Sequence, residues 1–297
     1  MESENKRIVK NTLMLYFRQI LILLTSLYTV RIVLQALGAE DYGIYNVVAG
    51  TVTMFGFLTN SLAGASQRFF SFELGQGNCE SLQKIFSLML AIYILLAITI
   101  LFFAETVGLW FVKNKLTIPA TRINAAVWVY QASIFSFIIS ILTTPYMAAI
   151  IARENMKIYA YASVIEAILK FLVALSLSFM PDKLIAYGFL LLIITFLNTA
   201  VYRIYCGKHY KECHFVFYWD KEKFKEIVSY SCWNLFGSSI SILKNQIMNI
   251  LLNIFFNPVV NAARSISVQV NNAVNSFAGN FTTAMRPQII KQYAAGK

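Results

Sequence analysis

Charged residues are scarce in this 297-residue chain, in which Asp, Glu, Lys and Arg together make up only 13% of the sequence. Soluble domains carry about 25% of such residues. Hydrophobic residues account for 58%, and the mean hydropathy is +0.61. A soluble helical bundle needs polar outer faces, and most apolar runs of this chain lack them. The composition therefore excludes an ordinary soluble protein and favours one embedded in a bilayer.

The sequence also lacks the patterns of an enzyme. It contains no Walker-type phosphate loop and no constellation of residues suited to hydrolysis, so we expect no ATP hydrolysis and no catalytic activity. The formal net charge is +11. In a soluble protein this excess would suggest nucleic acid, but here the basic residues lie mainly where membrane topology requires them, so no nucleic-acid partner is expected.

Cysteine is rare as well, and its positions predict neither disulfides nor a metal centre. The four cysteines lie at or near predicted cytoplasmic ends, where thiols stay reduced. A zinc ion could in principle be held by four neighbouring side chains, Cys206, His209, Cys213 and His214. Their spacing matches no standard zinc site, so we predict no metal and no cofactor.

Long apolar runs are what the sequence has in abundance. Each covers about twenty residues or more, enough for a helix to cross the hydrocarbon core. The predicted spans are 13–37, 43–65, 85–112, 125–151, 159–180, 184–206, 227–256 and 259–285. The chain is therefore predicted to be an all-α integral membrane protein of about eight transmembrane helices.

The predicted loops carry an uneven share of basic residues. With a cytoplasmic N-terminus, about sixteen Lys and Arg side chains fall inside and about four outside, which fixes that orientation. The N-terminal apolar run is too long for a signal-peptide core and has no small-residue cleavage site, so it is predicted to remain as the first span.

A polar segment divides the chain. Residues 208–226 are rich in charge and aromatic side chains and are predicted to form a cytoplasmic linker at the headgroups. Shifting the sequence by about 219 positions places the last two spans over the first two, as in transporters built from repeated halves. We therefore predict a first lobe in residues 1–207, of about six helices, and the start of a second lobe in residues 227–297, of about two.

Charged side chains within the spans are the strongest indication of a functional site. At the centre of a span each costs about 2.5 to 3.5 kcal/mol on insertion scales, so these side chains should not face lipid. Glu166 and Lys170 are four residues apart on one helix face and are predicted to form an ion pair. The predicted substrate cavity includes these cations: Arg18, Lys170, Lys244 and Arg264.

Amide side chains form stripes on the last two predicted spans. Asn245 and Asn249 share one face of the seventh span, and Asn271 and Asn275 share one face of the eighth. Such faces suit water or a polar ligand, and we assign all four residues to the substrate cavity. Hydrogen bonding between packed helices is the alternative explanation.

Five segments resemble those of a known family. They are LGAEDYGIY (37–45), ASQRFF (65–70), SCWNLFG (231–237), NIFFNPVVNAAR (253–264) and RPQI (286–289). Together they resemble the polysaccharide (O-antigen type) flippases of the MOP exporter superfamily. Members usually have about twelve or more helices in two similar lobes, so the resemblance implies a fragment whose second lobe is only begun.

The resemblance implies a function. Such flippases move undecaprenyl-diphosphate-linked oligosaccharide across the bacterial inner membrane by alternating access, for surface polysaccharides such as the O-antigen of lipopolysaccharide. With no Walker-type loop, an ion gradient or the membrane potential is the expected drive, with Na+ or H+ as a possible coupling ion, and glycan-assembly proteins are possible partners. Two alternatives stay open: a cation-coupled multidrug exporter of the same superfamily, and a membrane partner in glycan assembly that transports nothing itself.

The predicted topology can be tested by cysteine labelling. We expect cysteines introduced as Ser3→Cys and Asp220→Cys to react with a membrane-impermeant thiol reagent only after the cells are opened, because both positions are predicted to be cytoplasmic. Labelling of either cysteine in intact cells would contradict this orientation.

Overall fold

The chain is folded almost entirely into α-helices in the computed structural model. The structure describes the backbone of residues 2–53, 55–116, 118–255 and 258–296, but not the side chains of 2–5, 53, 57, 238–239, 241–255, 258–270 and 272–273. The helices are α1 (Glu2–Thr53), α2 (Gly56–Gln76), α3 (Cys79–Phe103), α4 (Leu109–Asn114), α5 (Ile123–Ala152), α6 (Met156–Ser176), α7 (Lys183–His209), α8 (Lys221–Phe255) and α9 (Pro258–Ala294). No strand occurs in these described ranges, which confirms the all-α class.

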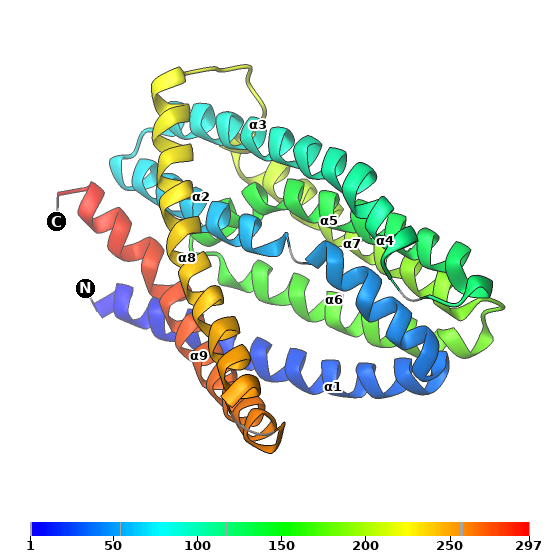
Figure 1. Ribbon diagram of the computed structural model, residues 1–297. Helices are drawn as coiled ribbons and strands as arrows, with labels where there is room; N and C mark the ends of the chain where they lie inside the picture. Colours follow the sequence, from blue (N-terminus) through cyan, green and yellow to red (C-terminus); the bar gives the residue numbers. More distant parts are fainter. Residues whose placement is uncertain (1, 54, 117, 256–257, 297) are drawn as a thin grey trace.

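The long helices lie side by side in a bundle, and both chain termini emerge at the same end of it (Figure 1). We call this the terminal end and the other the opposite end. Helix α5 occupies the middle, because it contacts α1, α2, α3, α6 and α7. Helices α8 and α9 pack against the side of the bundle, where α2 contacts both and α1 contacts α9.

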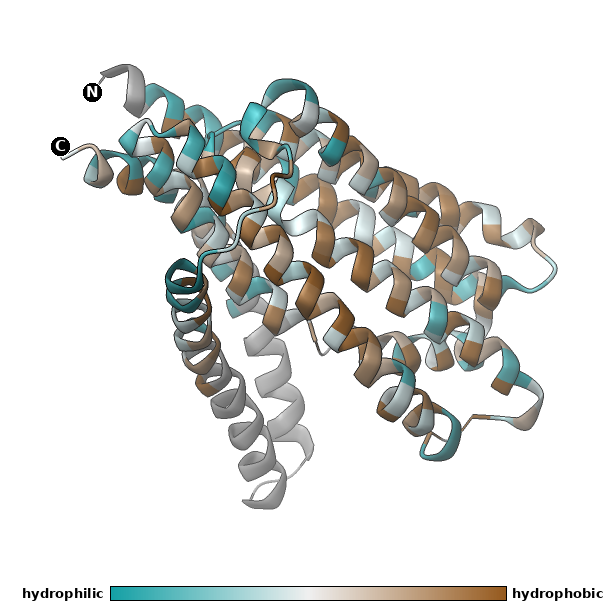
Figure 2. Cartoon of the chain, turned by 90° about the horizontal axis from the view of Figure 1, so that it is seen from above, coloured by the Kyte–Doolittle hydropathy of each residue, from teal (hydrophilic) through white to brown (hydrophobic). Residues whose placement is uncertain are grey.

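Five segments of the described chain are long and apolar enough to cross a membrane. They are Lys6–Val52, Cys79–Asn114, Ile123–Ala152, Met156–Phe179 and Lys183–His209. Helices also occur at the remaining predicted spans, in α2, α8 and α9, whose sequences carry more polar residues. Figure 2 shows brown, apolar residues along the length of the bundle and teal, polar residues gathered at its ends, as a membrane-spanning protein requires.

The second predicted span is not one continuous helix in the structure. The chain reverses at Gly38, where φ is 79° and ψ is 169°, and the returning helix ends at Thr53 before α2 begins at Gly56. The predicted span 43–65 is therefore divided between the last part of α1 and the first part of α2. Side chains with a Cβ atom almost never adopt the backbone conformation of Gly38.

Small residues allow the central helices to approach closely. A Cβ atom on Gly188 of α7 would lie 3.4 Å from Val129 Cγ2 and 3.6 Å from Ala132 Cβ, both on α5. Large apolar side chains point outward instead, and Phe17, Ile98 and Phe196 are each more than 60% exposed. With lipid outside, close packing of small residues is a principal source of helix association.

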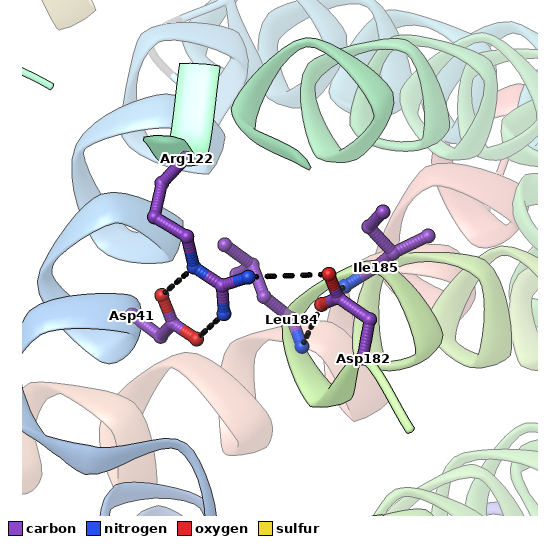
Figure 3. A network of polar contacts seen from close by, with 5 residues as sticks. All are labelled: Asp41, Arg122, Asp182, Leu184 and Ile185. Atoms are coloured by element: carbon purple, nitrogen blue, oxygen red, sulfur yellow. Dashed lines mark hydrogen bonds and ion pairs between the residues drawn. The ribbon is translucent and has the colours of Figure 1, made fainter. Parts of the chain in front are cut away.

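An ionic network joins three elements at the opposite end (Figure 3). Arg122 Nε donates to Asp41 Oδ1 at 2.8 Å, and Arg122 Nη1 donates to Asp182 Oδ2 at 3.2 Å. Asp182 Oδ1 also accepts from the backbone N–H groups of Leu184 and Ile185, so it caps the start of α7. The hydrogen bond that Arg122 donates to Asp41 raises the pKa of Arg122 above its ordinary value. The network ties the returning part of α1 to α7.

The reversal at Gly38 predicts a difference between two glycine substitutions. We expect Gly38→Ala to lower the stability of the folded protein by about 1 to 3 kcal/mol, because alanine is strained at this backbone conformation. Gly43→Ala is the matched control, since both glycines have open space around the Cβ position and Gly43 lies within a helix. Thermal unfolding in detergent would measure both, and equal midpoints would contradict the prediction.

Candidate functional site

A cavity of about 440 Å³ lies inside the bundle, enclosed by the returning part of α1 and by α5, α6 and α7. Apolar residues such as Val52, Leu191 and Met147 form part of its wall. The polar part of the wall contains hydroxyl and amide side chains from two neighbouring helices, Ser133, Ser136, Ser140, Thr143, Thr144, Thr195, Asn198 and Thr199.

Helix geometry explains why these hydroxyl groups gather in one place. Ser133, Ser136 and Ser140 recur at intervals of three and four residues, which places them on one face of α5. Thr195 and Thr199 do the same on α7, and the hydroxyl oxygens of Thr199 and Thr143 lie 2.7 Å apart. The two polar faces therefore meet across the closely packed contact of α5 with α7.

The threonine hydroxyl groups of this wall have backbone carbonyl acceptors on their own helices. Thr143 donates to the Ile139 carbonyl at 2.8 Å, and Thr195 donates to the Leu191 carbonyl at 3.0 Å. Their oxygen atoms retain lone pairs. The cavity wall therefore offers acceptors for the hydroxyl protons of a ligand.

An ion pair lines another part of the cavity. Lys170 Nζ lies 2.6 Å from Glu166 Oε1, and Asn198 Nδ2 donates to Glu166 Oε2 at 2.7 Å. Glu166 and Lys170 are one turn apart on α6, and Asn198 comes from α7. Because each oxygen of the carboxylate has a donor, the charge of Glu166 is compensated inside the bundle.

Arg18 lies directly behind this wall and is only 9% exposed. Its guanidinium carbon is 4.5 Å from the centre of the Tyr159 ring, and its Nη1 donates to Ser163 Oγ at 3.4 Å. Tyr159 and Ser163 both line the cavity. On its other side, Arg18 Nη2 donates to Asn280 Oδ1 of α9 at 3.4 Å. Arg18 thus connects α1 to the cavity wall on α6 and to α9.

The positive charge of Arg18 is incompletely compensated. Its Nε atom is buried and has no hydrogen-bond partner. Among the described residues, no carboxylate lies within ion-pair distance of it, whereas the other cation of this site, Lys170, has Glu166. A buried cation without a counterion is costly, and an anion beside it would be stabilising.

Two other predicted site residues, Asn271 and Asn275, do not line this cavity. Asn275 Nδ2 donates to Asn271 Oδ1 at 2.7 Å, and both side chains are exposed rather than lining this cavity. The remaining four, Lys244, Asn245, Asn249 and Arg264, have side chains outside the described residues. A cavity between two lobes therefore stays a prediction, and the cavity seen here lies within residues 1–207.

Sequence reasoning missed the hydroxyl groups of α5 and α7. Their signal was available, because polar residues at helical spacing interrupt otherwise apolar runs. A hydroxyl group costs far less in a membrane than a charge does, and it commonly bonds within its own helix. The pairing of the two faces could only be known once α5 and α7 were placed side by side.

The cysteine and histidine residues considered as zinc ligands make separate contacts with other parts of the chain. Cys206 Sγ lies 3.6 Å from the Tyr146 carbonyl, and His209 stacks on Tyr205. The hydrogen bond with Cys206, together with burial, raises the pKa of the Cys213 thiol. Zinc binds thiolates, which such an environment disfavours. Within the described part of the chain, no group of three metal-ligating side chains is placed to hold an ion.

Comparison with known protein families shows to which family the chain belongs. The family model described as "Polysaccharide biosynthesis protein" matches residues 8–292. The chain belongs to this family. The match confirms the resemblance drawn from the sequence segments. A search of the curated proteins found no match.

Solved structures with the same fold include transporters. One is an outward-facing MATE family multidrug resistance transporter of the MOP superfamily, with a TM-score of 0.80, 12% identity, and coverage of 98% of this chain and 65% of that one. A Vibrio cholerae MATE transporter matches with a TM-score of 0.75 and 14% identity, and the match covers 99% of this chain and 67% of that one. The third is a MOP superfamily transporter from Pyrococcus furiosus, described as having a binding pocket of reverse polarity. It matches with a TM-score of 0.75 and 12% identity, and the match covers 98% of this chain and 65% of that one. The family member described here thus has the MOP transporter fold and spans about two thirds of the length of these structures.

The polar wall predicts that water reaches the cavity. In a variant whose four native cysteines are replaced by serine, we expect Ser136→Cys to react with a small, water-soluble thiol reagent. Ser66→Cys is the control, because Ser66 is fully buried outside the cavity and bonded to Tyr93. The control should react at least about tenfold more slowly, since thiol reactivity follows access. Equal rates, followed by mass spectrometry, would contradict a hydrated cavity.

Proposed function

We propose that this protein takes part in flipping undecaprenyl-diphosphate-linked oligosaccharide across the bacterial inner membrane by alternating access, for surface polysaccharide synthesis. Membership of the polysaccharide biosynthesis family and the MOP transporter fold support a membrane transporter. The specific cargo is our inference from the chemistry of the cavity.

The single observation that carries this inference is the buried, incompletely compensated charge of Arg18. A lipid-linked oligosaccharide carries a diphosphate, and a guanidinium group binds phosphate oxygens through charge-assisted hydrogen bonds. Arg18 already holds the wall residues Tyr159 and Ser163, so a small rearrangement would expose its guanidinium group to the cavity. Lys244 and Arg264 are proposed to extend the same cationic surface from the α8 and α9 side.

The rest of the cavity suits an oligosaccharide. The hydroxyl groups of Thr143 and Thr195 donate within their own helices and retain lone pairs that can accept hydrogen bonds, and the amide of Asn198 can donate them, which matches the hydroxyl groups of sugars. The polyprenyl chain would remain outside, where the outward-facing side chains are large and apolar. A flippase needs this arrangement, in which the oligosaccharide binds inside the protein and the polyprenyl chain stays in the lipid.

The energy for transport is proposed to come from an ion gradient or the membrane potential, with Na+ or H+ as a possible coupling ion, because the sequence contains no nucleotide-binding loop. The protein is proposed to lie in the inner membrane with a cytoplasmic N-terminus. Its terminal end would then face the cytoplasm, where the lipid-linked substrate is made.

A second candidate function is cation-coupled drug export, and Glu166 is the observation that favours it. A carboxylate in a membrane cavity is suited to binding a proton, a sodium ion or a cationic drug. Here Glu166 is already paired with Lys170 and Asn198, so it has little capacity for another cation. We therefore rank this candidate below the flippase.

The proposal predicts the effect of removing the cavity cations. In the full-length gene product, we expect Arg18→Ala, Lys244→Ala or Arg264→Ala to abolish surface glycan export without preventing membrane insertion, since removing a buried charge eases insertion. Arg18→Lys and Arg264→Lys should retain part of the activity, because lysine meets a phosphate as a point charge but lacks the guanidinium fork. Glycan staining of cells that lack their own flippase would measure export.

Arg31→Ala is the matched control, because Arg31 is an exposed arginine on the same helix as Arg18. Its glycan export should equal that of the unsubstituted protein. Undiminished export from all three alanine variants, at normal protein levels, would remove the support for an anionic cargo. No glycan export from the unsubstituted full-length protein would favour the cation-coupled alternative.

A further inference from the structure

A second pocket, of about 510 Å³, opens at the terminal end of the bundle. Its walls come from the start of α1, from the connection between α5 and α6, and from the end of α9. Five basic residues and a single carboxylate line it: Arg7, Lys10, Arg153, Lys157, Lys291 and Glu154. This pocket is separate from the cavity described above, since the two have no lining residue in common.

The carboxylate organises one wall of this basic pocket. The side chain of Glu154 is 2% exposed, and it lies 2.8 Å from Arg7 Nη2 and 2.8 Å from Lys291 Nζ. Its backbone has a positive φ of 60°, and its carbonyl oxygen accepts from Asn11 Nδ2 at 3.2 Å. Glu154 thereby holds two cations from opposite ends of the chain in fixed positions.

More positive charge is present than the carboxylates compensate. Arg153 pairs with Glu212. Lys10 and Lys157 are exposed and have no carboxylate partner in the part of the chain that the structure describes. Burial lowers the pKa of Lys291, and the hydrogen bond with Glu154 only partly opposes this. The pocket is therefore an environment in which an added anion is favourable.

The start of α6 adds to this field. Asn155 is the N-cap residue of α6, but its side chain accepts no capping hydrogen bond from the helix. It donates instead to the hydroxyl oxygen of Tyr205 at 2.7 Å and to that of Tyr210 at 3.4 Å. The positive end of α6 therefore adds its field to the five cations around the pocket.

We propose that the pocket bounded by Arg7, Lys10, Arg153, Lys157 and Lys291 binds a phosphate or diphosphate group. Several donors on flexible lysine stems, arranged around cations that Glu154 already fixes, match the many acceptor oxygens of such a group. The group can belong to the headgroup of an anionic lipid or to free phosphate in solution. This site is additional to the proposed transport function, and its test measures binding without transport.

Calorimetric titration of the purified full chain in zwitterionic micelles tests the proposal with two probes, inorganic pyrophosphate and short-chain phosphatidylglycerol. We expect the double variant Lys10→Gln with Lys157→Gln to bind at least about tenfold more weakly, because two charge-assisted contacts are lost. Both side chains are exposed, so the variant should fold normally. The control is Lys208→Gln with Lys211→Gln, which removes two exposed lysines at the same end of the bundle but outside the pocket.

The outcomes separate the sources of the ligand. Binding of pyrophosphate that weakens only in the pocket variant identifies free phosphate as a ligand. The same pattern with phosphatidylglycerol, but not with pyrophosphate, identifies a lipid headgroup. Equal weakening in the pocket variant and in the control would show that general surface charge attracts the probes. That result, or no binding of either probe, would overturn the proposal.

Discussion

The hydrocarbon environment requires that polar groups be satisfied inside the protein, and the architecture follows from that requirement. Backbone N–H and C=O groups bond within each segment, so the described chain is helical apart from short connections. The same requirement controls the side chains. Threonines within the bundle donate to their own helices, and Glu166 receives both Lys170 and Asn198. The requirement is not fully met at Arg18, whose buried Nε atom has no hydrogen-bond partner, and the proposed function uses this unpaired donor.

The cavity results from how the helices pack around α5. Gly188 lets α7 approach α5 closely, and this contact brings Thr199 and Thr143 together. The reversal at Gly38 and the break between Thr53 and Gly56 return the chain along the bundle, so that Tyr45 and Val52 form another side of the same space. The backbone freedom of one glycine thereby helps to place the wall of a site far from it.

Ionic networks hold the bundle at its two ends in different ways. At the opposite end, Arg122 bridges Asp41 and Asp182 and thus ties α1 to α7 within the predicted first lobe. At the terminal end, Glu154 ties Arg7 of α1 to Lys291 of α9. Only the second network reaches α9, which belongs to the predicted second lobe. Movement of one lobe against the other would have to break the contact of Glu154 with Lys291 but could leave those of Arg122 intact.

The sequence by itself determined the class, the approximate positions of most long helices and the family, because long apolar runs and short segment motifs are local properties. It also predicted that Glu166 and Lys170 would be neighbours, since one helical turn separates them. Only the tertiary structure decided which helix faces meet. It brought the hydroxyl groups of α5 against those of α7, placed Arg18 beside Tyr159, and gathered Arg7, Glu154 and Lys291, which are far apart in the chain. Such contacts depend on the order and rotation of packed helices, and a single sequence carries no local signal for either.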